Sequence, residues 1–193
     1  MKRIVYFIAL VILFASCEEK TKRNSLEEIG KTQSQMLQAF QKVDSLRHEG
    51  IVEENIMNDF IDQAHAFYEL YPEEKVAPEM LVNAGVASMT LAKYYKETQP
   101  DDIASKAKYA RQALSTFDII VKVYPDYSGV KKSYLNKALI YDDILEDYSS
   151  AELEYREFIH KYPHDSISYN LSNYLQYLGK TPEEIMAEFS TKK

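Results

Sequence analysis

The chain has 193 residues, 46% of them hydrophobic and 27% charged, with few glycines, no tryptophan and a formal net charge of -7. These values predict one domain, or one domain with a tether, and enough apolar residues for a core. The acidic balance argues against nucleic acid as a partner, because phosphate binding needs clustered lysine and arginine. It also argues against charge-driven adhesion of the folded part to an anionic membrane.

The N-terminal segment has the layout of a secretory signal. Lys2 and Arg3 give a positive start, residues 4–14 are all apolar, and two small residues then precede Cys17. The apolar run is too short to span a bilayer, which needs roughly 20 apolar residues. The segment is therefore predicted to be a leader rather than a transmembrane helix. The alternatives are an ordinary secretory signal with a chance cysteine, or a buried N-terminal helix.

The residues before Cys17 resemble the lipobox of bacterial lipoproteins. The run Phe14-Ala15-Ser16-Cys17 has the two small residues that give the peptidase access, although family members more often have leucine where Phe14 stands. The resemblance implies a signal peptide over 1–17 and a lipid on Cys17. It also explains why a secreted chain has a single cysteine, which cannot form an internal disulfide.

The polar residues 18–24 predict a flexible tether between the anchor and a domain over 25–193. Glu18, rather than aspartate, follows the cysteine, and by the same resemblance this favours the outer membrane. The periplasmic face is expected. Acidic residues after the cysteine also resemble surface-export tags, so the cell surface stays open.

From residue 25 onward, apolar residues recur with a helical period, and no alternating strand pattern or hairpin dipeptide is present. Eight helices joined by short polar turns are predicted, which implies an all-α fold of antiparallel helix hairpins. In chain order, they run from a capping box at Ser25 and Glu28 to Gly50, from near Ile56 to Tyr71, from near Pro78 to a turn at Pro100, from Asp102 to Tyr124, over Tyr134 and Ile144, from a cap at Ser149 or Ser150 to Tyr162, from Tyr169 through Leu178 to Gly179, and onward from a capping box at Thr181 and Glu184.

Three of these helices end on the dipeptide Tyr-Pro, and the endings at Pro125 and Pro163 lie 38 residues apart. A helix pair that recurs at this period points to a solenoid. The third and fourth helices have some fifteen extra residues between them, which suggests that both are longer than is usual for such a helix pair.

The spacing inside the helices resembles the tetratricopeptide repeat, or TPR, over residues 75–190. Around Pro72 the pattern departs from the repeat, because Phe60 stands in place of the alanine. The resemblance implies a short TPR-like solenoid, in which a small residue lets paired helices approach and an aromatic ring fills the space left. The matching positions are Ala113, Phe117 and Pro125 in one helix, Ala151, Tyr155 and Pro163 in another, and Ala138 and Tyr141 between them, with the three alanines expected at tight helix contacts.

Tyrosines recur at intervals of seven residues between Tyr127 and Tyr169. One interpretation is that Tyr134 and Tyr141 line a helix against which Tyr155 and Tyr162 pack, and that the rest is coincidence. The other is that some hydroxyls point into a peptide-binding groove.

A groove of this kind is expected on the first helix of each hairpin. Amide side chains there bond an extended peptide, since they both donate and accept. The predicted positions are Tyr169, Asn173 and Gln176 in the last hairpin and Leu135, Leu139 and Asp142 in the one before.

The sequence holds no recognisable catalytic or cofactor motif. His160 and His164 have the separation of a helical metal pair, but Pro163 interrupts the helix between them, so no metal site is expected. No phosphate-binding glycine loop or nucleophile elbow occurs. We therefore expect no cofactor and no enzymatic activity.

The predicted function is a membrane-anchored interaction scaffold for another envelope protein, in outer-membrane assembly or in secretion. A lipoprotein that binds a small ligand or a glycan is the alternative, because tyrosine rings stack on sugars.

Overall fold

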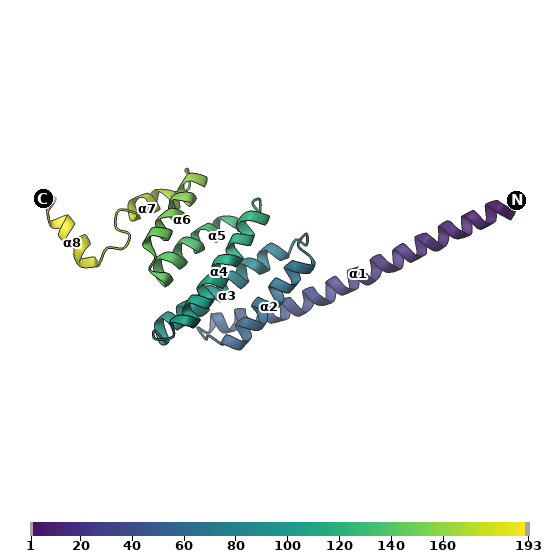
Figure 1. Ribbon diagram of the computed structural model, residues 1–193, viewed down its shortest axis with the longest axis horizontal. Helices are drawn as coiled ribbons and strands as arrows, with labels where there is room; N and C mark the ends of the chain where they lie inside the picture. The colour runs from purple at the N-terminus through teal and green to yellow at the C-terminus, as the bar shows by residue number, and fades with distance from the viewer. Residues whose placement is uncertain (1, 192–193) are drawn as a thin grey trace.

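The computed structural model describes residues 2–191, with side chains over 25–188 and at Ser190. All elements in this part of the chain are helical, and no strand occurs there. The predicted signal peptide, Cys17 and the tether lie outside the residues whose side chains are described. The elements are α1 (Lys2–His48), α2 (Glu54–Leu70), α3 (Ala77–Thr98), α4 (Ile103–Val123), α5 (Val130–Leu139), the π-helix η1 (Ile140–Leu145), α6 (Tyr148–Lys161), α7 (Ser166–Tyr174) and α8 (Pro182–Thr191), as Figure 1 shows.

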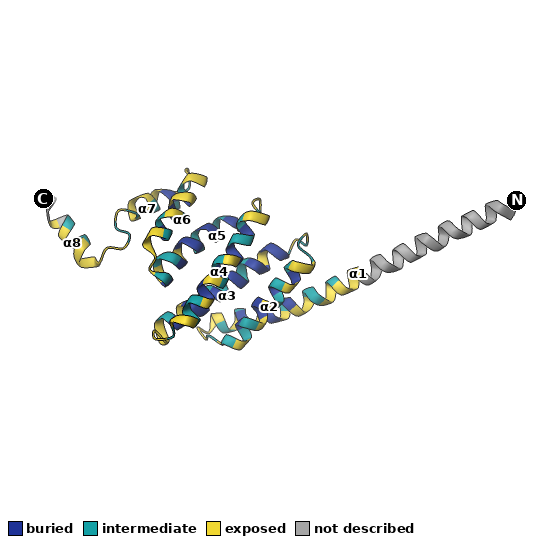
Figure 2. Cartoon of the chain, viewed as in Figure 1, coloured by how far each residue is buried: buried dark blue, intermediate teal, exposed yellow. Residues whose placement is uncertain are grey.

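Successive helices fold back on one another, so that the C-terminal part of α1, from Met36 onward, and α2 to α6 form one packed body (Figure 1). The described part of α1 and the short α8 lie on opposite sides of this body (Figure 2). The prediction that the third and fourth helices are long is confirmed, since α3 has 22 residues and α4 has 21, against 10 in α5 and 14 in α6. Within the part of the chain that the structure describes, no helix is long and apolar enough to cross a membrane.

The three Tyr-Pro helix endings are confirmed. Tyr71, Tyr124 and Tyr162 are the C-caps of α2, α4 and α6, with φ of -138°, -124° and -127°. Each leaves the helical region because the ring of the following proline clashes with a helical residue before it. Their amides still donate to the carbonyl oxygens of Phe67, Ile120 and Phe158, which closes the last turn of each helix.

Glycine and side-chain caps fix the other boundaries. Gly50, which follows α1, has φ of +70°, the left-handed conformation that glycine adopts freely; Gly179 has φ of +74° but lies in the turn between α7 and α8 and does not cap α7 as predicted. The predicted box at Thr181 is confirmed, because its amide donates to Glu184 Oε2 at 2.8 Å and the Glu184 amide donates to Thr181 Oγ1 at 3.2 Å. Asp102 caps α4 as predicted, by accepting from the Ser105 amide.

Three predicted boundaries are wrong. Ser25 lies inside α1 and is not its N-cap. Asp147, rather than a serine, caps α6, because a carboxylate accepts from both the amide and the hydroxyl of Ser150. The fifth helix does continue over Tyr134 and Ile144 as predicted, although from Ile140 it is a π-helix. The seventh ends at Tyr174 instead of near Leu178.

The core lies where the helices of the packed body meet, whereas α7 and α8 are mostly exposed (Figure 2). Ala113, Ala138 and Ala151 are fully buried, as predicted for small residues at helix contacts. In α1 the first buried residue is Met36, and residues 25–35 are exposed or half-buried.

A glycine and an aromatic ring set the approach of α3 to α4. Gly85 in α3 faces Phe117 in α4 so closely that a Cβ on Gly85 would meet ring atoms at 2.7 and 2.8 Å. Both residues are buried, and Phe117 has no exposed surface. The ring therefore occupies the space that the missing side chain leaves.

A half-buried histidine joins α2 to α4. His65 Nε2 lies 2.9 Å from Thr116 Oγ1, and the Thr116 hydroxyl donates to the Gln112 carbonyl at 2.8 Å. Because the hydroxyl has one proton, its oxygen accepts from His65, which places the ring proton on Nε2. Burial lowers the pKa of His65, and the nearby carboxylates of Glu69 and Asp62 oppose this only in part.

The lowered pKa predicts that acid weakens the fold. A neutral ring stabilises the folded state fully above the ordinary pKa of 6.5, and this contribution is lost as the pH falls below it. We expect urea unfolding to show lower stability at pH 5.5 than at pH 7.5. His65→Gln, which keeps a hydrogen-bond donor and does not titrate, should remove most of that difference. The exposed His160→Gln should retain it, and an equal response of both variants would contradict the assignment.

Candidate functional site

The strongest candidate site is a cleft of about 640 Å³ beside the π-helix, which we call the η1 cleft. Its walls come from segments far apart in the sequence: the end of α3, the π-helix, the start of α6, and the chain from α7 to α8. Acidic and aromatic side chains dominate it. The residues that line it are Lys96, Leu139, Asp142, Asp143, Glu146, Tyr148, Tyr174, Tyr177, Gly179, Lys180 and Ile185.

The backbone of this wall is irregular. After Leu139 the chain forms one π-helical turn, and it ends at Glu146, which has φ of 56° and is the one described non-glycine residue with a positive φ. The Asp147 amide then donates to the Tyr141 carbonyl at 2.8 Å. Short π-helical turns and residues with positive φ concentrate at functional sites, because strain survives only where the surroundings enforce it.

Asp142 is fixed by two tyrosine hydroxyls. Tyr155 donates to Asp142 Oδ2 at 2.9 Å and Tyr174 donates to the same oxygen at 2.6 Å, and the two rings meet edge to face at 5.7 Å. Burial and this carboxylate raise the pKa of both tyrosines, so both stay protonated donors. One carboxylate thus connects η1, α6 and α7.

The opposite wall carries Lys96 of α3. Its amine lies 3.0 Å from Glu146 Oε1 and 3.7 Å from Asp143 Oδ1, and it also donates to the Asp143 carbonyl. Burial alone would lower the pKa of Lys96, but the bonds to Glu146 and Asp143 outweigh burial and raise it. The lysine therefore stays charged and holds the end of the π-helix against α3.

Tyr148 closes the cleft on the side of α7. Its ring lies against Gly179, where a Cβ would meet ring carbon atoms at 2.9 and 3.0 Å. The ring is still 42% exposed. With carboxylates and partly exposed rings around one hollow, the cleft suits a cationic or amide-bearing group, which bonds carboxylates and stacks on aromatic faces.

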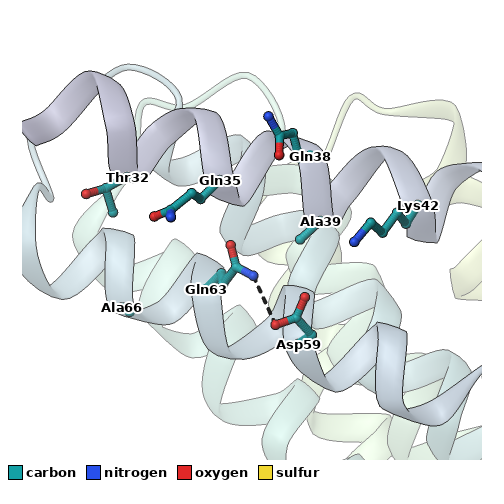
Figure 3. Close-up of a pocket in the computed structure, with 8 residues that line it drawn as sticks. All are labelled: Thr32, Gln35, Gln38, Ala39, Lys42, Asp59, Gln63 and Ala66. Carbon is teal, nitrogen blue, oxygen red and sulfur yellow. Dashed lines mark hydrogen bonds between the residues drawn. The ribbon is translucent and has the colours of Figure 1, made fainter. Parts of the chain in front are cut away.

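A second, smaller cleft of about 390 Å³ lies between α1 and α2, and polar side chains line it beside two alanines (Figure 3). We call it the α1–α2 cleft. Gln63 Nε2 donates to Asp59 Oδ1 at 3.0 Å, and both side chains rise from α2 toward α1. The residues that line it are Thr32, Gln35, Gln38, Ala39, Lys42, Asp59, Gln63 and Ala66.

The residues predicted for a groove do not share one. Leu139 and Asp142 lie together in the η1 cleft, whereas Gln176 lines a separate hollow between α6 and α7 beside Arg156 and His160. Leu135 packs against the core cluster around Tyr134. On α7, Tyr169 is 73% exposed and Asn173 is also exposed, and neither lines a cleft described above.

The packing interpretation of the tyrosine series is confirmed for its central members. Tyr134 meets Tyr162 edge to face at 6.0 Å, and Tyr141 packs against the cluster that contains Tyr155. Tyr148, from the same series, lies in the η1 cleft.

Sequence reasoning missed several residues of the η1 cleft. Tyr174 and Tyr177 fall outside the seven-residue spacing, and no local pattern connects Lys96 of α3 to a π-helix more than forty residues later. The acidic pair Asp142-Asp143 was a visible signal, although adjacent residues of a regular helix point to different sides.

Comparison with known proteins gives no further guide to this site, since the chain matches no family model, no curated protein and no solved structure. Among the residues that the structure describes, no group of three His, Cys, Asp or Glu side chains is placed to hold a metal ion.

Proposed function

We propose that this chain is a lipid-anchored envelope protein that holds a segment of another protein in the η1 cleft. The packed body acts as a short TPR-like solenoid, which supplies a rigid surface and no chemistry. The solenoid part of the proposal is supported by the series of antiparallel helices with fully buried alanines at their contacts, and by Gly85 beneath the Phe117 ring.

The observation that carries the proposal is the composition of the η1 cleft. Tyr148, Tyr174 and Leu139 are 42%, 39% and 39% exposed around one hollow, beside carboxylates already held by hydrogen bonds. Protein interfaces favour partly exposed aromatic residues whose positions are fixed in advance, because little conformational entropy is then lost on binding. A partner segment with basic and apolar side chains fits these walls.

The partner is tested by photocrosslinking in cells, with a photoreactive amino acid at Leu139 of the full chain. We expect one discrete crosslinked protein. The control position is Leu153 of α6, which is 70% exposed and outside the described clefts. Equal crosslinking from both positions, or none from Leu139, would count against the scaffold. Stabilisation of the purified protein by a glycan in a thermal-shift screen would favour the alternative, a glycan-binding lipoprotein whose tyrosines stack on sugar rings.

The anchor is tested separately by Cys17→Ser. The proposal holds that a lipid on Cys17 retains the protein in the outer membrane, facing the periplasm. The variant lacks the thiol to which the lipid is attached, so we expect it to leave the outer-membrane fraction and the wild type to remain there. Ser16→Ala, which preserves a small residue before the cysteine, is the matched control. Equal membrane retention of Cys17→Ser would refute lipidation at this residue.

A further inference from the structure

The α1–α2 cleft is built from amide groups rather than from the acids and rings of the η1 cleft. We infer that it binds an extended segment of a partner polypeptide through the main-chain amides of that segment. The inference rests on the proposed scaffold function and gives it a second contact site. The two sites differ in chemistry and come from different helices.

The cleft is an open hollow between two helix faces, lined by polar side chains and two alanines. On α1 the lining positions recur every three or four residues, at Gln35, Ala39 and Lys42, and on α2 they do so at Asp59, Gln63 and Ala66. Each set therefore occupies one helix face, and the two faces lie opposite one another (Figure 3). Ala39 and Ala66 add little bulk, which leaves room between the taller polar side chains.

Gln63 supplies the observation that points most directly to a ligand. Its Oε1 atom is buried and has no hydrogen-bond partner among the described residues, although its Nε2 donates to Asp59. A buried acceptor without a partner costs about 1–3 kcal/mol. A peptide N–H that enters the cleft would remove this cost, and the soft terminal torsion of glutamine allows the amide to turn toward it.

The opposite wall offers the complementary groups. The Gln35 side chain lines the cleft without a hydrogen bond to another described side chain, and its amide both donates and accepts, as a peptide unit does. Lys42 and Asp59 line the same cleft, and no ion pair joins them. Their charges set the orientation of the bound segment along the cleft, with a carboxylate of the segment beside Lys42 and a cationic group beside Asp59.

An extended segment fits this cleft better than a helix does. A helix has already paired its main-chain N–H and C=O groups, so it could not satisfy Gln63. The cleft volume of about 390 Å³ is also at the lower end of the range for small-ligand sites. A cleft of this size accommodates a few extended residues but not a helix about 10 Å across.

The test uses a phage-displayed library of random heptapeptides against the full-length protein in detergent. We expect wild type to enrich peptides that Gln63→Met binds at least tenfold more weakly. N-methylation of single peptide bonds in an enriched peptide should weaken binding similarly, because it removes the N–H groups. Gln41→Met, an exposed glutamine of α1 outside this cleft, is the control and should bind as wild type does.

Protein stability separates a binding role of Gln63 from a structural one. Methionine has a similar shape and no unpaired acceptor, so Gln63→Met should unfold at the same urea concentration as wild type or at a higher one. Marked destabilisation would instead assign Gln63 to the fold and overturn the inference. So would a library from which wild type enriches nothing, or peptides whose affinity is unchanged in Gln63→Met. The scaffold proposal is decided independently, by crosslinking at Leu139.

Discussion

Phe117→Ala is expected to lower the free energy of unfolding by about 4 kcal/mol, the largest effect of any single substitution considered for this chain. The Phe117 ring is fully buried and lies directly over Gly85. Its loss leaves a cavity whose floor has no side chain to fill it. The helices α3 and α4 are the longest pair in the packed body, so they have little freedom to collapse onto the gap. Urea denaturation followed by far-ultraviolet circular dichroism measures the change.

Leu153→Ala is the matched control for this prediction, because Leu153 is a large apolar residue that is 70% exposed. Its replacement should change the free energy of unfolding by less than about 0.5 kcal/mol. Comparable losses in the two variants would mean that Phe117 does not fill the contact between α3 and α4.

Lys137→Met is expected to destabilise the protein by about 3 kcal/mol. The side chain of Lys137 is 11% exposed, and its amine lies 2.8 Å from Asp118 Oδ1 of α4 and 3.0 Å from Glu154 Oε1 of α6. Burial alone would lower the pKa of Lys137, but the bonds to the two carboxylates outweigh burial and raise it. Methionine fills the space and leaves the Glu154 charge without its cation, while Glu154 Oε2 already has no hydrogen-bond partner among the described residues.

The design of this experiment isolates the unpaired charge. Addition of Glu154→Gln to Lys137→Met should restore part of the stability, because it removes the uncompensated carboxylate. Lys132→Met on the same helix is the control, since Lys132 is exposed. A Lys137→Met variant as stable as this control would show that water, rather than the lysine, neutralises the two carboxylates.

The all-helical fold was predictable because its signals are local. A proline after the last turn of a helix disfavours the helical conformation of the residue before it, so Tyr71, Tyr124 and Tyr162 end their helices as expected. The box at Thr181 needs only two side chains three residues apart. The prediction at Ser25 was wrong because a capping pattern is also compatible with a helix that continues through it.

The candidate site was less predictable because it depends on tertiary contacts. The π-helix η1 packs against α3 and α4, which come earlier in the chain. The Asp142 carboxylate is fixed by tyrosines that come thirteen and thirty-two residues later. The helical period placed Leu139 and Asp142 on one face and predicted their proximity. It gave no indication of Lys96, or of the α1–α2 cleft, whose key observation is a buried oxygen that no sequence pattern reveals.

The first turns of the described part of α1 hold the packed body at a fixed distance from residue 25. Eleven residues of helix separate position 25 from Met36, where burial begins, and at 1.5 Å each they span about 16 Å. Each residue of a helix adds a fixed rotation about the helix axis as well as a fixed rise along it. One residue inserted before Thr32, the first residue of the α1–α2 cleft, would turn the packed body by about 100° relative to residue 25, so this segment sets the orientation of both clefts as well as their distance from residue 25.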